Sequence, residues 1–372
     1  MAQSVTTEPP QKLPIQHLDW GAFVTLIGQA NAEIARYDGI LQSIPNPALL
    51  LSPLLRQEAV LSSRIEGTQA TLKEVLQFEA KPEQRTPKRD DIREVVNYRI
   101  ALETGAKKLE QIPLSLRLIR EIHEILLRDV RDQSRNRGVF RKIQNFIGAP
   151  GEKIENARYV PPGPDKLMDY LSNFEKYLHY EEKDRLVQAA IMHGQFEIIH
   201  PFIDGNGRVG RLLIPLFLYA KKVLYRPMFY ISAYFEQNRT EYYDRLLWVT
   251  QNNDWSGWIQ FFLMAVIQQS KVNIRKAQKI LSLYDDMKER IPEITRSQFS
   301  TQTIDVLFNN LIFTTKTFKE QSAIPKTSVH RILRSLTEAG IINVLAPSSG
   351  RSPTVFIFPQ LFQIAEEIEQ TE

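Results

Sequence analysis

Residues 200–211 read His-Pro-Phe-Ile-Asp-Gly-Asn-Gly-Arg-Val-Gly-Arg and bring several chemically active side chains into one short segment. The Gly-Asn-Gly at 205–207 tolerates positive φ, so the segment predicts a tight turn. A turn that feeds a helix N-terminus points free N–H groups at one spot, which favours an anion and best suits phosphate. Arg208 and Arg211 lie one helical turn apart near that end and add bidentate donors for phosphate oxygens.

Asp204 is out of place beside an anion unless it holds a cation, and one carboxylate plus substrate phosphates is the usual protein contribution to a Mg²⁺ site. We expect His200 in an extended conformation because a proline follows it, and from there it can face the same cavity. An imidazole with a pKa of about 6.5 suits a general base. A base, a metal carboxylate and a phosphate cradle together indicate transfer of a phosphorus-centred group to a hydroxyl. Each feature alone has an ordinary structural explanation, and we favour function because they coincide at this spacing.

The whole chain has 372 residues, which predicts two or three domains. It contains 0 cysteines, so disulfides and thiolate metal sites are excluded, and this composition fits a reducing, cytoplasmic location. No apolar run reaches membrane-spanning length, so we expect no membrane partner. The formal net charge of +4 permits a nucleic-acid partner without requiring one.

Helical spacing of the apolar residues predicts a mainly α fold. The expected helices cover 20–37, 53–66, a segment opening with a capping box at 71–74, 92–109, 113–130 with Pro113 in its first turn, 164–180, 184–199, 208–222, 238–251 and 255–290. The helix over 208–222 is strongly apolar and is expected to be central and buried. Residues 138–164 combine β-branched and aromatic residues around a Gly/Pro turn, which predicts an irregular hairpin.

These signals divide the chain into successive regions. We predict a mobile N-terminus at 1–14, an N-terminal helical region at 15–90, a core at 91–260, a connecting helix at 261–297 and a C-terminal unit at 298–372. The charged segment 85–92 is the expected break between the second and third of these.

Glu66 falls in the last turn of the predicted helix 53–66, and Gly67 follows as a helix C′ residue should. A carboxylate at the negative end of a helix dipole is unfavourable by roughly 0.3–1 kcal/mol unless a cation compensates it. Glu66 is therefore either an exposed side chain that tolerates this small cost or one aimed at a specific arginine.

The C-terminal unit has a different pattern. Short helices are expected at 302–310, 315–321 and 326–339, followed by strands at 341–345 and 354–358 around a turn-rich tip, which is the order of a winged helix-turn-helix. Basic and polar residues off the apolar stripe of the third helix, and one at the tip, are candidates for contact with DNA: Lys326, Thr327, His330, Arg331, Arg334 and Arg351. A protein-interaction or dimerisation role is the alternative.

Residues 200–211 resemble the signature His-Pro-Phe-x-Asp-Gly-Asn-Gly-Arg-x-x-Arg of the Fic (Fic/Doc) family at every defining position. The resemblance implies an all-helical core with a β-hairpin flap that binds ATP and transfers AMP to a Ser, Thr or Tyr hydroxyl of a protein. It further implies that His200 deprotonates the acceptor and that Asp204 holds Mg²⁺ between the α- and β-phosphates. The residues implied to contact nucleotide are Gly205, Asn206, Gly207, Arg208, Val209, Gly210 and Arg211, with Arg211 at the γ-phosphate and Tyr242 and Tyr243 near the base.

Residues 62–67, Ser-Ser-Arg-Ile-Glu-Gly, are similar to the inhibitory motif Ser/Thr-x-x-x-Glu-Gly/Asn of many Fic members. The resemblance implies that Glu66 pairs with Arg211 and misplaces the γ-phosphate, with Ser62 and Gly67 completing the motif. The hairpin 138–164 resembles the family's flap, which can hold a target segment as an added strand, although a plain structural hairpin is an equal alternative.

We therefore expect an autoinhibited, Mg²⁺-dependent protein adenylyltransferase whose target is another protein or a second copy of itself. Removal of AMP, with Glu66 positioning a water molecule, is an alternative reaction for the same site. A transcription regulator whose core senses nucleotide is an alternative of another class, and a homodimer is possible in either case. The preference for ATP over other nucleotides rests on the resemblance alone.

Overall fold

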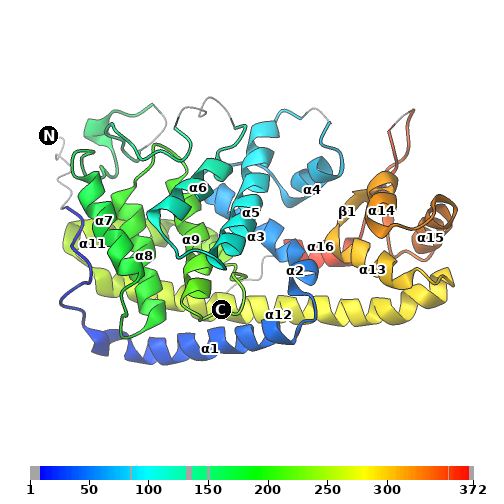
Figure 1. Cartoon of the computed structure of the whole chain (residues 1–372), viewed down its shortest axis with the longest axis horizontal. Helices are drawn as coiled ribbons and strands as arrows, with labels where there is room; N and C mark the ends of the chain where they lie inside the picture. The colour runs from blue at the N-terminus through cyan, green and yellow to red at the C-terminus, as the bar shows by residue number, and fades with distance from the viewer. Residues whose placement is uncertain (1–8, 84–85, 131–135, 149–150, 351, 368–372) are drawn as a thin grey trace.

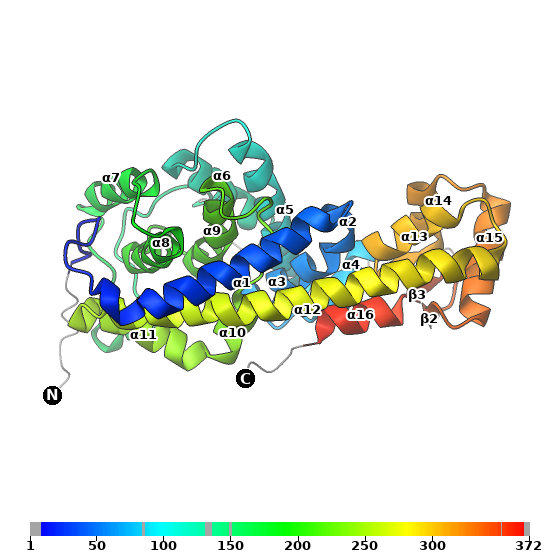
Figure 2. The same cartoon turned by 90° about the horizontal axis from the view of Figure 1, so that it is seen from below.

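A computed structural model describes residues 9–83, 86–130, 136–148, 151–350 and 352–367. The fold is mainly α, as predicted, and its helices form an elongated molecule with the C-terminal unit at one end of the long axis (Figure 1). Two long helices, α1 (Val24–Ser43) and α12 (Trp255–Thr295), run side by side along the underside of the other helices (Figure 2). At 41 residues α12 is about 60 Å long, so it underlies both the core and the C-terminal unit.

The core is a set of helices built around the packed pair α8 and α9. They are α5 (Arg89–Leu109), α6 (Leu116–Leu126), α7 (Leu167–Leu178), α8 (Arg185–Ile199), α9 (Asn206–Ala220), α10 (Ser232–Gln237) and α11 (Arg239–Asn252). Every residue of α9 from Asn206 to Leu218 is buried, which confirms the prediction of a central buried helix. It packs against α8, α5 and α6, so its N-terminus is held from several sides.

The N-terminal helical region contributes α2 (Pro47–Leu50), α3 (Ser52–Ile65) and α4 (Leu72–Ala80). Helix α3 is buried along nearly its whole length because it lies between α5, α10 and the C-terminal unit. Gly67 follows it with a φ of +97°, a conformation that only glycine adopts at little cost. The capping box of Thr71 and Glu74 opens α4 as predicted.

The C-terminal unit holds α13 (Ser300–Asn309), β1 (Ile312–Thr314), α14 (Thr315–Ser322), α15 (Lys326–Glu338), β2 (Asn343–Ala346), β3 (Val355–Ile357) and α16 (Pro359–Glu366). The strands form an antiparallel sheet in the order β1-β3-β2, with Ile357 paired to both Ile312 and Asn343. The three expected helices and the hairpin are present. The assignment of this unit as a winged helix-turn-helix stays a prediction.

Several local predictions were wrong. Ser115 caps α6, so Pro113 precedes the helix and does not stand in its first turn. Within the described part of 138–164, one antiparallel bridge, Ile147 to Tyr159, replaces the expected paired strands. Two side chains of the segment itself, Arg141 and Gln144, bind its main-chain oxygens at Pro162 and Pro161 instead. Residues 9–14 of the predicted mobile N-terminus are held by Leu13, which is buried and exchanges two hydrogen bonds with Asn173. Residues 1–8 lie outside the described residues.

Other elements escaped prediction because they are short. Helices α2, α10 and α16 and strand β1 have between three and eight residues each, too few to establish a period. The boundary expected at 260/261 falls inside the continuous helix α12, which starts under the core at Trp255.

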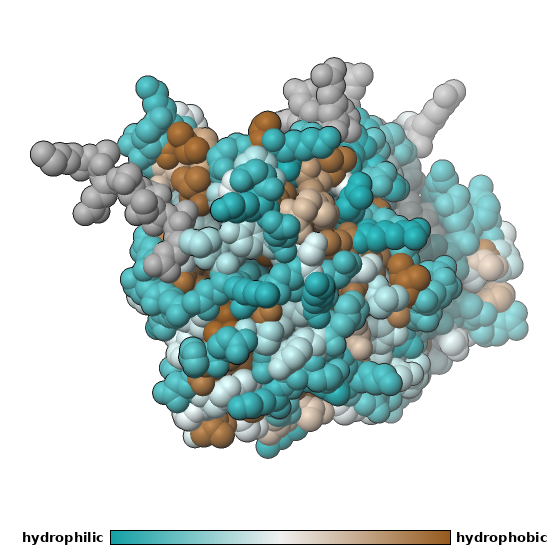
Figure 3. Space-filling model, turned by 60° about the vertical axis from the view of Figure 1, so that its left-hand side comes forward, coloured by the Kyte–Doolittle hydropathy of each residue, from teal (hydrophilic) through white to brown (hydrophobic). Residues whose placement is uncertain are grey.

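The surface at the core end of the molecule is mostly hydrophilic, with separate apolar patches (Figure 3). Among the described helices, none combines the length and the apolar composition that a membrane crossing requires.

Candidate active site

The turn between α8 and α9 places His200 where the chain reverses. His200 has φ 49° and ψ 61°, so it is left-handed and not extended as we expected. The proline after it disfavours the right-handed helical region, as predicted. His200 closes α8 with a bond from its N–H to the Phe196 oxygen and adopts the left-handed conformation that is common where helices end. This conformation is strained for a residue with a Cβ, and the surrounding contacts must maintain it.

The turn itself is fixed by Asn206. Its side-chain oxygen accepts a hydrogen bond from the Phe202 N–H at 2.8 Å, and its amide group donates to the Phe202 oxygen at 2.8 Å. Gly205 precedes it with a φ of +78° and serves as the N-cap of α9. Because α9 begins at Asn206, the first N–H groups of the helix point out of the turn, as an anion site requires. The Asn206 side chain therefore fixes the conformation of the loop.

His123, on α6, holds the same turn through hydrogen bonds and ring stacking. Its Nδ1 accepts a hydrogen bond from the Gly138 N–H at 2.9 Å, so the ring proton is on Nε2. Nε2 donates that proton to the main-chain oxygen of Asp204 at 3.0 Å. Burial lowers the pKa of His123 to about 4, which agrees with a neutral ring. The ring also stacks on Phe202 at a centroid distance of 3.7 Å.

Arg208 is buried and points away from solvent into an ion pair with Glu94 of α5. Its Nη1 lies 2.7 Å from the Glu94 Oε2, and its Nη2 lies 3.5 Å from the Asp204 Oδ1. Thr68, just after α3, donates a hydrogen bond to the same Glu94 carboxylate. Burial raises the pKa of Glu94, while Arg208 acts in the opposite direction. Glu94 thus connects the first motif arginine to the segment that follows the inhibitory motif.

Arg211 and Glu66 form the ion pair that the resemblance implied. The Arg211 Nη2 lies 2.6 Å from the Glu66 Oε1, and the arginine side chain has 0% exposure. Ser62 accepts two further hydrogen bonds from the guanidinium, at 2.9 Å through Oγ and 2.8 Å through its main-chain oxygen. Burial is the largest single effect and lowers the pKa of Arg211, but Glu66, Tyr242, Tyr243 and Glu197 together outweigh it, and the net shift is upward. Ser62 lies in the last turn of α3 and Glu66 caps the helix four positions later, so both reach one guanidinium.

His200 is held neutral. Burial lowers its pKa to about 4, with Glu66 opposing the shift. Its Nδ1 lies 3.3 Å from the Glu197 carbonyl oxygen, which can only accept, so Nδ1 carries the proton and Nε2 keeps a lone pair. Buried Arg141 donates from Nε to the His200 oxygen at 2.9 Å and also binds the Pro162 oxygen, so it ties segment 138–164, the candidate flap, to the turn of residues 200–206, the candidate catalytic turn.

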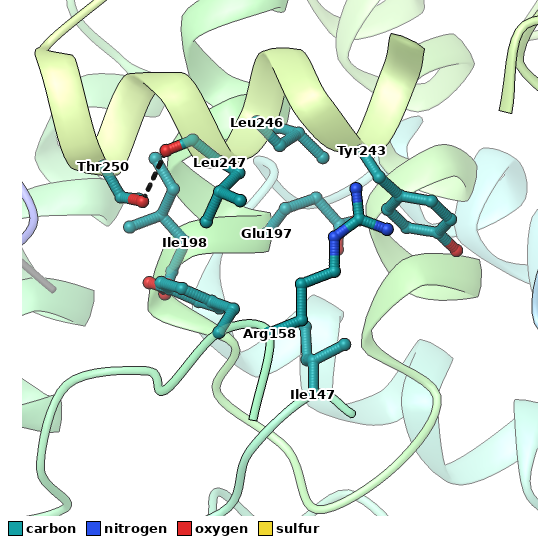
Figure 4. Close-up of a pocket in the computed structure, with 9 residues that line it drawn as sticks. Ile147, Arg158, Glu197, Ile198, Tyr243, Leu246, Leu247 and Thr250 are labelled. Atoms are coloured by element: carbon teal, nitrogen blue, oxygen red, sulfur yellow. Dashed lines mark hydrogen bonds between the residues drawn. The ribbon is translucent and has the colours of Figure 1, made fainter. Parts of the chain in front are cut away.

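An apolar pocket opens beside this turn, between the flap and α11 (Figure 4). Tyr243 lies at one side of it, and the Arg158 guanidinium lies 5.5 Å from the centre of its ring. The other lining residues are Ile147, Tyr159, Glu197, Ile198, Leu246, Leu247 and Thr250. A slot of this kind suits a flat ring system. Tyr242, the other tyrosine that we expected near the base, does not line the pocket, because its hydroxyl is buried against the His193 Nε2 at 2.9 Å.

Glu197 brings an acid to this apolar pocket. Its Oε1 is buried and has no hydrogen-bond partner among the residues that the structure describes, and a Cβ on Gly210 would lie only 2.2 Å from it. Burial raises the pKa of Glu197 to about 8, with Arg211 opposing the shift and Glu66 adding to it. The carboxyl group is therefore mostly protonated at neutral pH and can donate as well as accept a hydrogen bond.

Asp204 stands at the rim of the site, with 43% of its side chain exposed. No group of three or more His, Asp or Glu side chains among the described residues could hold a metal ion by itself. A single rim carboxylate next to a phosphate cradle does fit an ion that arrives with a nucleotide, because Mg²⁺ commonly combines one carboxylate with phosphate oxygens and water.

Sequence reasoning missed three supporting residues: His123, Glu94 and Arg141. All three are distant in sequence from the motif and reach it only in the folded structure. His123 had one weak signal, since it lies on the buried face of α6 beside Ile119 and Leu126, where a polar residue needs a partner.

The expected DNA-contact residues separate into two groups. Lys326, His330 and Arg334 line an open groove, and Thr327 is exposed at the start of α15. Arg331 points elsewhere, because its Nη1 donates to the Thr295 oxygen at 2.8 Å. Arg351 lies outside the described residues.

Comparison with known proteins agrees with this geometry. The Fic/DOC family N-terminal profile matches residues 24–107, and the Fic/DOC family profile matches residues 113–218, which includes the whole catalytic turn. Together the two matches cover about half of the chain. The chain belongs to the Fic/DOC family.

Among curated relatives, the Protein adenylyltransferase Fic of Drosophila grimshawi is 27% identical over 217 residues, which cover 56% of this chain and 39% of that protein. The protein of the same name from Drosophila melanogaster is 26% identical over 217 residues and is covered to 38%. The match therefore spans well under half of each relative's length.

Solved structures share the fold. A Fic family protein from Desulfovibrio desulfuricans G20 superposes with a TM-score of 0.58 at 20% identity, covering 94% of this chain and 98% of that chain. Fic-1 (residues 134–508) from C. elegans gives a TM-score of 0.53 at 19% identity and covers 69% of this chain and 73% of that chain.

Proposed function

We propose that the chain is a protein adenylyltransferase that transfers AMP from ATP to a protein hydroxyl and is held inactive by Glu66. The observation that carries the proposal is the shared use of Arg211. It lies on α9 one turn after Arg208, next to the free N–H groups of the helix, yet its guanidinium is occupied by the Glu66 carboxylate. The names of the curated relatives support the same reaction.

The chemistry begins with His200. Its Nε2 lone pair can take the proton of an acceptor hydroxyl, because the ring is neutral and Nδ1 is engaged with the Glu197 oxygen. The hydroxyl oxygen forms a bond to the α-phosphorus, and the bond from that phosphorus to the bridging oxygen breaks. Pyrophosphate leaves and AMP stays on the protein target. The main-chain N–H groups at the start of α9, with Arg208 and Arg211, are placed to stabilise the charge on the phosphates.

Asp204 is the residue that would hold Mg²⁺, and the ion would neutralise charge on the α- and β-phosphates when bound. The base of the nucleotide suits the pocket beside Tyr243, where Arg158 lies over the tyrosine ring. The Glu197 carboxyl group is a polar group in this pocket that can bind a ring nitrogen or a hydroxyl of the nucleotide.

Inhibition follows from competition. A γ-phosphate and the Glu66 carboxylate are both anionic, and both need the Arg211 guanidinium. With Glu66 in place, the γ-phosphate lacks its partner, and the α-phosphate is not aligned with the incoming hydroxyl.

The test uses ATP labelled on the α-phosphate, with the full-length chain alone and with a cell lysate. Wild type should label weakly, Glu66→Gly strongly, and Glu66→Gly/His200→Ala not at all. ATP labelled on the γ-phosphate is the control. Label from γ-labelled ATP alone would mean phosphate transfer and would overturn the proposal.

Removal of AMP is the second candidate for this site. Glu66 is 31% exposed on its side chain and acts electrostatically on His200, so it can also position a water molecule near the base. Incubating an AMP-modified target with wild type and with Glu66→Gly separates the two reactions. Release of free AMP by wild type alone would favour removal.

A further inference from the structure

The C-terminal unit carries a concentrated positive surface far from the catalytic turn. We define the basic groove as Lys316 and Lys319 of α14 and Lys326, His330 and Arg334 of α15. All five residues are exposed, and they line one open groove that continues to the β2–β3 hairpin. Its described lining contains no Asp or Glu. The chain as a whole has a formal net charge of only +4, so this accumulation is local.

The fold explains why these cations gather. Helix α15 buries Val329, Ile332, Leu333 and Leu336, and the residues at 326, 330 and 334 recur every fourth position along an adjacent, exposed face. On α14, Lys316 and Lys319 stand three residues apart and join the same groove. The sequence prediction named the α15 residues but omitted both lysines of α14, because only folding brings the two helices together.

The basic groove is available to a partner. Arg334 has one carboxylate nearby, Glu338 at 3.8 Å, but both side chains are at least 70% exposed, so water and salt weaken that pair. Arg331, by contrast, is tied to the Thr295 oxygen at the end of α12 and takes no part in the groove. The two arginines of α15 therefore differ: Arg331 is bound to the end of α12, whereas Arg334 faces the groove and has only a weak, exposed ion pair.

We propose that the basic groove binds the phosphate backbone of double-stranded DNA, with α15 as the element that approaches the major groove. Helix α15 has 13 residues and is about 20 Å long, and a helix of this kind fits a major groove about 12 Å wide. The lysines of α14 flank it, as phosphate contacts flank a reading helix. Polar Thr327 is exposed near the start of α15, where base contacts are made in helix-turn-helix proteins. The proposal is independent of the adenylyl-transfer proposal.

The expected strength follows from the number of cations. Four Lys or Arg side chains in the groove predict a slope of about −3.6 in a plot of log binding constant against log salt concentration, because each neutralised phosphate contributes about −0.9. The double variant Lys316→Glu/Lys319→Glu should reduce the magnitude of that slope to about 1.8 and weaken binding at least tenfold at low salt.

The test measures fluorescence anisotropy of a labelled duplex of mixed sequence, titrated with the full-length chain from 50 to 200 mM salt. The matched control is Lys288→Glu/Lys279→Glu, which makes the same charge change at exposed lysines of α12 outside the groove and should keep at least half of the affinity. Thermal unfolding and the labelling activity in the Glu66→Gly background confirm that each variant is folded.

Several results would overturn the proposal. They are the absence of salt-dependent duplex binding by wild type at 50 mM salt, equal losses in the groove and control variants, and tighter binding of an acidic peptide than of the duplex. The last result would assign the groove to a protein partner. Retention of binding by His200→Ala, together with its loss in the groove variant, would support the proposal, since the catalytic turn takes no part in it.

Discussion

Replacing Glu66 with glutamine tests the ion pair at the centre of the site. The change keeps the shape of the side chain and removes its charge. Arg211 has 0% exposure, and its Nη2 lies 2.6 Å from the Glu66 Oε1. Leaving a buried charge without its partner typically costs about 3–5 kcal/mol. Two features lower that cost here: Ser62 still accepts two hydrogen bonds, and Glu66 itself is 31% exposed.

We therefore expect the nucleotide-free variant to lose about 2 kcal/mol of free energy of unfolding. The same change frees Arg211 for a γ-phosphate. A competition relieved by about 2 kcal/mol corresponds to about 30-fold, since about 1.4 kcal/mol is tenfold. The rate of AMP transfer at subsaturating ATP should rise by about that factor.

Urea unfolding measures the stability, and initial rates with ATP labelled on the α-phosphate measure the transfer. Glu103→Gln is the control, because Glu103 is 52% exposed and its partner Arg99 keeps a second ion pair with Glu79, so stability should change by less than about 1 kcal/mol. A Glu66→Gln variant with the stability and the labelling rate of wild type would refute the reasoning, because the pair would then neither hold Arg211 nor exclude the phosphate.

Three further changes test neighbouring parts of the site. The pKa of Glu197 is raised to about 8, so between pH 4.5 and 8 the folded state binds more protons than the unfolded state. This group therefore makes the free energy of unfolding fall by up to about 1.4 kcal/mol per pH unit as the pH rises from 6 to 8. Urea unfolding of Glu197→Gln should lack that part of the pH dependence. Gly207→Ala would place a Cβ 2.2 Å from the Glu66 Oε1 and 3.0 Å from the Arg211 Nη1. The contact with Arg211 remains when Glu66 is removed, so labelling should stay low in the combination with Glu66→Gly, and recovery of activity there would contradict a role of this turn in binding phosphate. His123→Ala should lower the free energy of unfolding, measured with urea, by about 2–3 kcal/mol, because it leaves the Gly138 N–H without its partner and opens a cavity. A decrease of less than about 0.5 kcal/mol would show that the ring does not hold the turn.

Local chemistry explains which features were predictable. The Gly-Asn-Gly turn, the buried helix after it and the four-residue spacing of Ser62 and Glu66 are properties of short segments, and the structure has all of them. The partner of Glu66 was reached only through the family resemblance, since a helix dipole indicates a cation without naming one.

Long-range contacts explain the rest. Glu94 meets Arg208 across more than a hundred residues, and Arg141 meets the His200 oxygen from the flap, so no periodicity in either segment marks them. We predicted an extended His200 because the effect of the following proline on its backbone is the only constraint visible in the local sequence. The bond from Arg141 to the His200 oxygen, which comes from a distant segment, favours one of the conformations that this rule leaves open.

The burial of α3 on several faces has a kinetic consequence. Glu58, in its middle, accepts two hydrogen bonds from Ser232 of α10, and α16 packs against the same helix from the C-terminal unit. Moving α3 as a body would break all of these contacts, whereas releasing Glu66 requires only rotation of one side chain beyond the helix end. Side-chain rotation is faster by orders of magnitude than helix displacement. We therefore expect release to be a rapid equilibrium that ATP concentration itself shifts, so that inhibition is graded and not all-or-none.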